Sequence, residues 1–176
     1  MRDLRQRQLS SELLYQGRVV SLHRDQVAMP DGQVVERVVV EHHGAVGVVP
    51  MTDDGQVILV RQWRYATGGA LLEIPAGGLE PGEDPELAAA RELQEEIGYR
   101  PGKLVKLGEF FTAPGFCSEL LHLYLATELQ PSHLPGDDDE DIEVVRIPLV
   151  ELATHLGELR DAKTLVGLLM AQRMMA

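Results

Sequence analysis

The chain has 176 residues, which is enough for one ordinary domain with a small appended subdomain and for a core that needs no disulfide to hold it. Its 16 Lys and Arg against 28 Asp and Glu give a formal net charge of −12; so acidic a surface repels phosphate backbones and anionic lipid, and we expect neither nucleic acid nor a membrane as a partner. The single cysteine, Cys117, excludes an intramolecular disulfide and a cysteine-based zinc site, and one free thiol fits a reducing cytoplasm.

The N-terminal region, up to residue 45, is predicted to form strands and turns. Its first residues are basic but no apolar run follows them, so we expect neither a signal peptide nor a transmembrane span. Alternating apolar residues over 17–29 and a β-branched run over 34–42 predict two strands, with the hairpin turn "PDGQ" between them. We expect residues 1–45 to form a small β-subdomain, separate from residues 46–176.

The rest of the chain is predicted to combine strands with helices. Strands are expected at 44–51, 55–65, 103–114, 119–129 and 142–149, and a short one leads into the Gly- and Pro-rich loop before residue 85. Two helices are expected at the C-terminal end, over 149–159 and 162–175. Strands on both sides of a mid-chain helix, with helices at the end, predict an α/β fold in which an α/β/α sandwich is built around a mixed β-sheet.

The mid-chain helix is predicted to begin at Pro85 and to end before Gly98. Leu87, Ala90 and Leu93 recur at helical spacing, so one face of this helix is expected to pack against the rest of the domain. The loop before the helix is rich in glycine, which allows its backbone to approach a ligand closely.

Three glutamates crowd one face of the same helix. Glu92, Glu95 and Glu96 stand at i, i+3 and i+4, where like charges repel. One interpretation is a solvated acidic face. The other is a metal site, because hard cations such as Mg²⁺ take carboxylate oxygens and keep several waters, which leaves room for phosphate oxygens. An acidic protein that handles a polyphosphate needs such a cation between itself and its ligand.

The helix and the loop before it carry a recognisable motif. Its fixed positions are Gly77, Glu83, Arg91-Glu92-Leu93, Glu95-Glu96, Gly98 and Tyr99. They follow the pattern G-x5-E-x7-R-E-U-x-E-E-x-G-U, where U is a bulky apolar residue, and this stretch resembles the signature of the Nudix hydrolases. Tyr99 departs slightly from the pattern, since the family usually has an aliphatic residue there. The resemblance implies the Nudix α/β/α sandwich and the hydrolysis of a diphosphate linked to another group.

The resemblance also implies roles for individual residues. Glu92, Glu95 and Glu96 match the metal ligands of the family, and the backbone carbonyl of Ala76 is often a further ligand. The metal is expected to be Mg²⁺, with Mn²⁺ as a substitute. Arg91 matches the arginine that orients the glutamates, and an ion pair with Glu83 is expected. Arg91 and Glu95 are therefore expected to take part in catalysis.

Other stretches resemble the ADP-ribose pyrophosphatases within this family. Pro114 stands 16 residues after Gly98, as the proline marker of these enzymes does, and "RQWRYATGGALLEIPAGGLEPGE" is similar to their sequences. The resemblance implies that Arg64 contacts a substrate phosphate and that Arg37 also contacts substrate. The alternative for both arginines is an exposed cation on a strand.

The general base is expected outside the signature, on the acidic loop "PGDDDED". Glu140 is the first candidate and Asp138 the second, because the resemblance places a glutamate of a loop after the sheet in this role. A solvated acidic loop is the alternative.

Taken together, the resemblance implies Mg²⁺-dependent hydrolysis of ADP-ribose to AMP and ribose 5-phosphate by a cytoplasmic homodimer. The dimer is expected to form through the N-terminal strands, exchanged between protomers, which would bring Arg37 near the partner's site. The alternative substrates are another nucleotide sugar or a dinucleotide, such as GDP-mannose or NADH. A Nudix fold that binds ADP-ribose without cleaving it is the third possibility.

Overall fold

The computed structural model describes residues 3–136 and 141–175, and the chain folds into two compact units. The first unit contains the residues up to 44 together with 111–120, and the second contains 45–110 and the residues from 121 onward. Nothing in the sequence pattern predicted that residues 111–120 would join the first unit.

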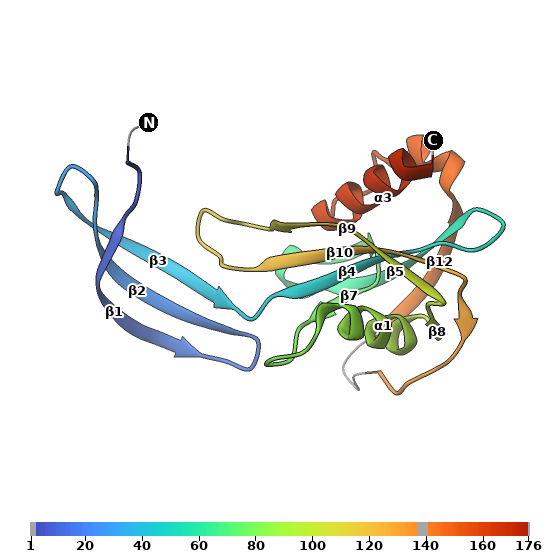
Figure 1. Ribbon diagram of the computed structural model, residues 1–176, viewed down its shortest axis with the longest axis horizontal. Helices are drawn as coiled ribbons and strands as arrows, with labels where there is room; N and C mark the ends of the chain where they lie inside the picture. Colours follow the sequence, from blue (N-terminus) through green and yellow to red (C-terminus); the bar gives the residue numbers. More distant parts are fainter. Residues whose placement is uncertain (1–2, 137–140, 176) are drawn as a thin grey trace. The chain divides into compact units, whose positions relative to one another are not determined.

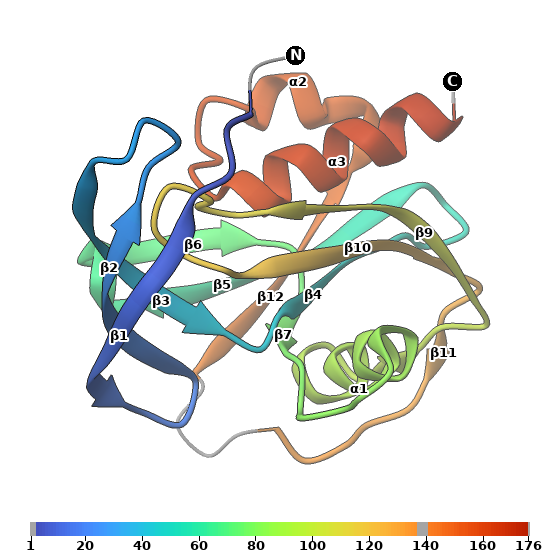
Figure 2. The ribbon, with the colours of Figure 1, turned by 60° about the vertical axis from the view of Figure 1, so that its left-hand side comes forward.

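The first unit contains a three-stranded antiparallel sheet of β1 (Arg7–Gln16), β2 (Val20–Ala28) and β3 (Val34–His42), with β2 in the middle (Figure 2). The predicted turn closes the β2–β3 hairpin. The Met29 N–H donates to the Gln33 carbonyl at 2.8 Å, and Gly32 has a φ of +88°, in the left-handed region that glycine enters without a steric penalty. Strand β1 was not predicted separately, because its apolar residues do not alternate regularly, and all of its residues are exposed.

The second unit is built on two larger sheets and a short ribbon. One sheet has the order β7-β4-β10-β9, in which β4 and β10 run parallel, and the other has the antiparallel order β12-β5-β6. The strands are β4 (Ala45–Pro50), β5 (Gln56–Arg64), β6 (Gly69–Glu73), β7 (Ala76–Gly78), β8 (Tyr99–Arg100), β9 (Lys103–Phe111), β10 (Leu120–Thr127), β11 (Gln130–Pro131) and β12 (Ile142–Pro148). The helical elements are η1 (Tyr65–Thr67), α1 (Pro85–Glu96), η2 (Leu149–Glu151), α2 (Leu152–His155) and α3 (Ala162–Met175).

Helices cover both faces of the sheet that contains β4. On one face Val46 and Val48 pack in a cluster with Leu93 of α1, and on the other face Val49 packs in a second cluster with Leu168 of α3. Figure 1 shows α3 and α1 on opposite sides of β4 and β10. A strand that is buried on both faces needs a continuous apolar run, and every residue of β4 is buried. The predicted α/β fold with helices on both sides of a mixed sheet is confirmed.

Two details of the helix predictions are wrong. Leu87 is exposed, because the buried face of α1 is formed by Ala88, Ala89, Glu92, Leu93 and Glu96. The helix expected over 149–159 is instead a 3-10 turn followed by the one-turn helix α2, and Gly157, a poor helix former, stands just beyond it. In the part of the chain that the structure describes, no helix combines the length and apolarity needed to span a membrane.

Candidate active site

Helix α1 carries the glutamates of the signature, and local signals fix where it begins and ends. The Asp84 carboxylate accepts the N–H of Glu86 at 2.8 Å as the N-cap, and Pro85 occupies the first turn, where a missing N–H does no harm. Beyond the last helical residue, Gly98 adopts a φ of +73° and turns the chain into β8. Local sequence signals therefore determine both ends of the helix that carries the acidic face.

Two of the three clustered glutamates lie on the buried face of α1. Glu92 and Glu96 are each 8% exposed and share this face with alanines and Leu93. The backbone of β7 lies against them: the Ala76 N–H donates to Glu96 Oε2 at 3.2 Å, and a Cβ added at Gly77 would collide with the Glu92 carboxylate. Glycine at position 77 is thus what allows the strand to approach Glu92 so closely.

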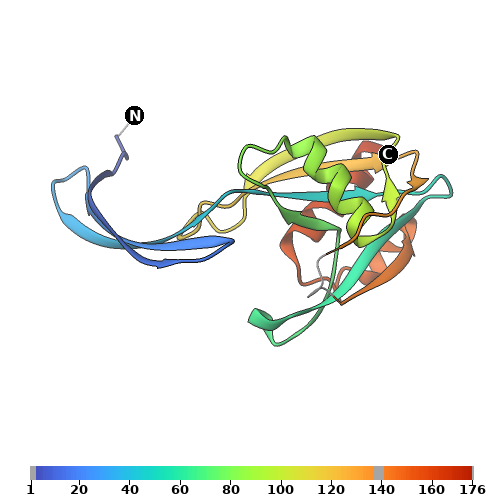
Figure 3. The ribbon, with the colours of Figure 1, turned by 90° about the horizontal axis from the view of Figure 1, so that it is seen from below.

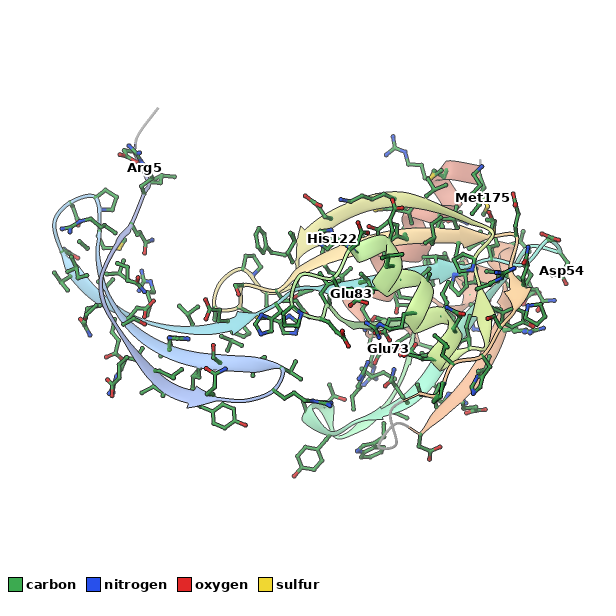
Figure 4. The ribbon with its side chains drawn as sticks, turned by 60° about the horizontal axis from the view of Figure 1, so that its bottom comes forward. Arg5, Asp54, Glu73, Glu83, His122 and Met175 are labelled. Carbon is green, nitrogen blue, oxygen red and sulfur yellow. The ribbon has the colours of Figure 1, made fainter. Side chains whose placement is uncertain are left out.

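Arg91 is the cation of this cluster. Its Nε and Nη2 donate to the two oxygens of Glu83 at 3.0 and 3.1 Å, and its Nη1 donates to Glu92 at 2.7 Å and to Glu95 at 2.9 Å. Nη2 also donates to the Gly78 carbonyl at 3.3 Å. The hydrogen bond with Glu83 is the largest of several contributions that raise the pKa of Arg91, and it lowers the pKa of the Glu83 carboxyl below its usual value. Glu83 lies beside α1 (Figure 4) and forms the expected ion pair.

The donor groups near α1 suit a hard divalent cation. Glu92, Glu95 and Glu96 offer carboxylate oxygens, and the backbone at Ala76 and Gly77 approaches two of them. Within residues 3–136 and 141–175, however, no three acidic, His or Cys side chains already converge as a ligand set. Arg91 Nη1 pairs with both Glu92 and Glu95 and offsets the repulsion between them. A bound cation would replace part of the pairing between Arg91 and these two glutamates.

A second ionic cluster lies along the β5–β6 hairpin, whose tip carries η1 (Figure 3): Arg64 is the last residue of β5, beside the tip, and Glu73 is the last residue of β6, opposite Val60. Arg64 donates from Nε and Nη2 to the two oxygens of Glu73, at 2.8 and 2.9 Å, and Lys163 of α3 contacts the same carboxylate. Glu73 is only 1% exposed. Burial alone would raise the pKa of Glu73, but the hydrogen bonds and charges of Arg64 and Lys163 outweigh it, and the pKa lies below the usual value.

The sequence analysis missed Glu73 and Lys163. A signal for Glu73 existed, because a single carboxylate in the apolar stretch "ALLEIP" has to be paired if the strand is buried. No comparable signal pointed to Lys163, which lies 90 residues away from Glu73 in the chain.

Four candidate residues remain, and two of them lie in the first unit. Arg37 and Pro114 lie in the first unit, where Arg37 is exposed on β3 and Pro114 is exposed in the 111–120 loop. This loop is attached to β3, because the Val40 N–H donates to the Phe116 carbonyl at 2.7 Å. Glu140 and Asp138 lie outside the residues that the structure describes.

Comparison with known proteins identifies relatives over most of the chain. The NUDIX domain profile matches residues 41–166. The ADP-ribose pyrophosphatase of Bacillus subtilis (strain 168) is 42% identical over 169 residues, which cover 93% of this chain and 91% of that protein. The methanol dehydrogenase activator of Bacillus methanolicus is 39% identical over 163 residues, covering 90% and 88%. A crystal structure of an ADP compounds hydrolase superposes with a TM-score of 0.85 at 27% identity, covering 99% of this chain and 97% of that one.

The chain therefore belongs to the Nudix family and is a Nudix hydrolase. Hydrolases of this family generally use a divalent metal ion. The recognition of the family from the signature residues is confirmed.

Proposed function

We propose that this enzyme hydrolyses the diphosphate bond of ADP-ribose to give AMP and ribose 5-phosphate. The observation that carries the proposal is the pair of buried carboxylates, Glu92 and Glu96, which lie against Gly77 and the rest of β7. The chain that holds them is 42% identical to an ADP-ribose pyrophosphatase. Glu92 and Glu96 are each 8% exposed and lie on the same face of α1, and a divalent metal would offset the repulsion between two carboxylates in such a site.

The metal proposed is Mg²⁺, with Mn²⁺ as a substitute. Glu92, Glu95, Glu96 and the carbonyl of Ala76 would hold it, and Arg91 would keep the glutamates oriented through its hydrogen bonds. When bound, the metal neutralises the diphosphate and lowers the pKa of a bound water. The protein itself positions these carboxylates and keeps Glu92 and Glu96 largely buried.

We assign substrate binding and activation of the attacking water to residues outside the signature helix. We propose that Arg64 binds the diphosphate, and its fork with Glu73 supports a fixed orientation for the guanidinium. Arg37 and Pro114 are proposed to contact the rest of the substrate. Glu140, with Asp138 as the second candidate, is proposed to take the proton of the water that attacks phosphorus as the bridging P–O bond breaks.

A substrate panel tests the proposed activity. Purified protein with Mg²⁺ is incubated with ADP-ribose, GDP-mannose, NADH and a nucleoside triphosphate, and the products are separated by chromatography. We expect the highest kcat/KM with ADP-ribose and the products AMP and ribose 5-phosphate. Much faster cleavage of GDP-mannose or NADH would move the enzyme to the alternative substrate class. Tight binding of ADP-ribose without cleavage of any compound would identify a binding module.

The protein is further proposed to act as a cytoplasmic homodimer that assembles through the N-terminal sheet. Strand β1 is exposed along its whole length and carries Leu9, Leu13 and Tyr15, an apolar strip that a second copy of the chain would cover in the proposed dimer. In solution we expect a mass near twice the 19.4 kDa of one chain. Leu13→Glu should reduce that mass to one chain by light scattering, whereas a wild-type protein that is monomeric and active at micromolar concentration would refute the dimer. The free thiol of Cys117 supports a reducing compartment.

A further inference from the structure

The three charged side chains of the cluster around Glu73 differ in their exposure to solvent. Glu73 is 1% exposed, Lys163 is 14% exposed and Arg64 is 38% exposed, so the guanidinium forms the outer layer and the other two groups lie behind it. Burying charges rarely increases stability over an apolar core of the same volume, because desolvation offsets the attraction between them. A buried ionic pair that supports a partly exposed cation therefore suggests a role in orienting that cation.

The N-terminus of α3 fixes the position of Lys163. The Asp161 carboxylate accepts the N–H of Thr164 at 2.9 Å, which caps the helix, and it accepts a hydrogen bond from the Thr164 hydroxyl at 2.5 Å. It also pairs with Lys163 at 3.0 Å. The Lys163 ammonium is thus held between Asp161 of its own helix start and Glu73 at the end of β6.

The same helix end holds the chain just beyond Glu73. The N–H of Ile74 donates to the Thr164 hydroxyl at 2.8 Å, and both residues are fully buried. Ala76, whose N–H donates to Glu96, follows two residues after Ile74, so at most about 7 Å of extended chain separates the two positions. Helix α3 therefore anchors the segment that follows Glu73, the partner of Arg64. This segment leads to Ala76, whose N–H donates to Glu96 of α1.

We propose that Lys163 is a positioning residue for the substrate diphosphate, acting through Glu73 on Arg64. This inference rests on the proposed function, in which Arg64 binds the diphosphate. The formal charges of Arg64, Lys163, Glu73 and Asp161 sum to zero. Removing Lys163 makes the local charge behind Arg64 more negative by one unit, which weakens the attraction of an anionic substrate to this position. Lys163 thus offsets the charge of Glu73 while Glu73 fixes the geometry of Arg64.

Three substitutions at one position test the charge and the hydrogen bond separately. Lys163→Met removes both, Lys163→Gln keeps a hydrogen-bond donor without the charge, and Lys163→Arg keeps the charge. With Mg²⁺ and ADP-ribose we expect KM to rise about tenfold in Lys163→Met and Lys163→Gln while kcat changes by less than about threefold. Lys163→Arg should restore KM to within about threefold of the wild type. Circular dichroism and Tm are measured for each variant.

A matched control comes from the same strand as Arg64. Arg61 pairs with Glu143 at 3.1 Å in an exposed position, where salt screens the interaction. Arg61→Met should leave KM unchanged. The proposal is overturned if folded Lys163→Met and Lys163→Gln keep the wild-type KM, or if Arg61→Met raises KM as much as they do. If Lys163→Met does not fold, equal KM values for Lys163→Gln and Lys163→Arg overturn it.

Failure of this inference is distinguishable from failure of the proposed function. The diphosphate is common to all nucleoside diphosphate derivatives, so the same rise in KM is expected with whichever compound of the panel the wild type cleaves best. A wild type that prefers another such compound would correct the substrate, and the Lys163 series would then be measured on that compound.

Discussion

The two ionic clusters of the second unit distribute their charges in opposite ways. Around α1, one cation, Arg91, is shared by Glu83, Glu92 and Glu95, with Glu96 close by on the same helix. At the β6 end, one carboxylate, Glu73, is shared by the two cations Arg64 and Lys163. Both clusters contain a buried carboxylate and an arginine that donates to both oxygens of one carboxylate.

The difference lies in the sum of the charges. The formal charges of the α1 cluster add to −3, whereas those of the Glu73 cluster, with Asp161 included, add to zero. An excess of one sign in a partly buried site is costly unless a counter-ion joins it. The difference is consistent with the proposed roles, in which the first cluster holds the metal and Glu73 and Lys163 orient Arg64 in the second.

The largest effect is expected from removing one carboxylate of the first cluster. Glu92→Gln and Glu96→Gln each delete a proposed metal ligand, so kcat should fall by on the order of 10³ or more, which corresponds to about 4 kcal/mol of transition-state stabilisation. Folding should persist, and Tm without metal should stay level or rise, because repulsion on α1 is relieved. Steady-state kinetics with Mg²⁺ and thermal melts with and without metal measure both effects.

Glu86→Gln is the matched control, since Glu86 is exposed on the first turn of the same helix. It should leave kcat within about twofold of the wild type, as surface substitutions usually do. Near-normal turnover by Glu92→Gln or Glu96→Gln would show that the acidic face of α1 is only a solvated surface.

A smaller effect is expected from crowding the first cluster without removing charge. In Gly77→Ala the new Cβ would meet the Glu92 carboxylate, so either β7 or Glu92 has to shift, and kcat should fall about 100-fold. Gly78→Ala is the control, because a Cβ at that position meets no atom within 4 Å. Equal activity of the two variants would mean that the spacing between β7 and Glu92 is unimportant for the reaction.

The first cluster could be predicted from sequence and the second could not, and distance along the chain explains why. Glu92, Glu95 and Glu96 lie on one helix, so helical periodicity brings them together, and the resemblance to the Nudix signature implied the pair between Arg91 and Glu83. Glu73 and Lys163 meet only after a strand and a helix 90 residues apart have packed. Local patterns carry no information about such a contact.

The error at Leu87 has a related cause. A hydrophobic pattern assigns carboxylates to the solvent face, yet Glu92 and Glu96 lie on the buried face of α1. The predicted apolar stripe was therefore rotated toward Leu87. The fold itself was predictable, because β4 is a continuous apolar run and strands stand on both sides of α1 in the chain, with helices at the end.

The expected effects on stability also separate the two clusters. Glu73→Gln leaves Arg64 and Lys163 without the carboxylate between them, so the free energy of unfolding at pH 7 should fall by about 3–5 kcal/mol. Glu83→Gln leaves Arg91 paired with Glu92 and Glu95, so the loss should be roughly 1.5–3 kcal/mol. Urea titrations at pH 7 measure both values, and a larger loss for Glu83→Gln would reverse the assignment of roles.

The pH dependence gives the last test, because the pKa values of both Glu73 and Glu83 are lowered in the folded state. A carboxyl with a lowered folded pKa binds fewer protons in the folded state than in the unfolded state, so its contribution to stability is present above the unfolded pKa, about 4.3. That contribution is lost as the pH falls from there through the folded pKa. Urea titrations of the wild type should therefore show stability decreasing below about pH 4.3, and each Gln variant should show a shallower decrease over the same range. A variant curve that runs parallel to the wild type would mean that the replaced carboxylate has no special stabilisation in its cluster.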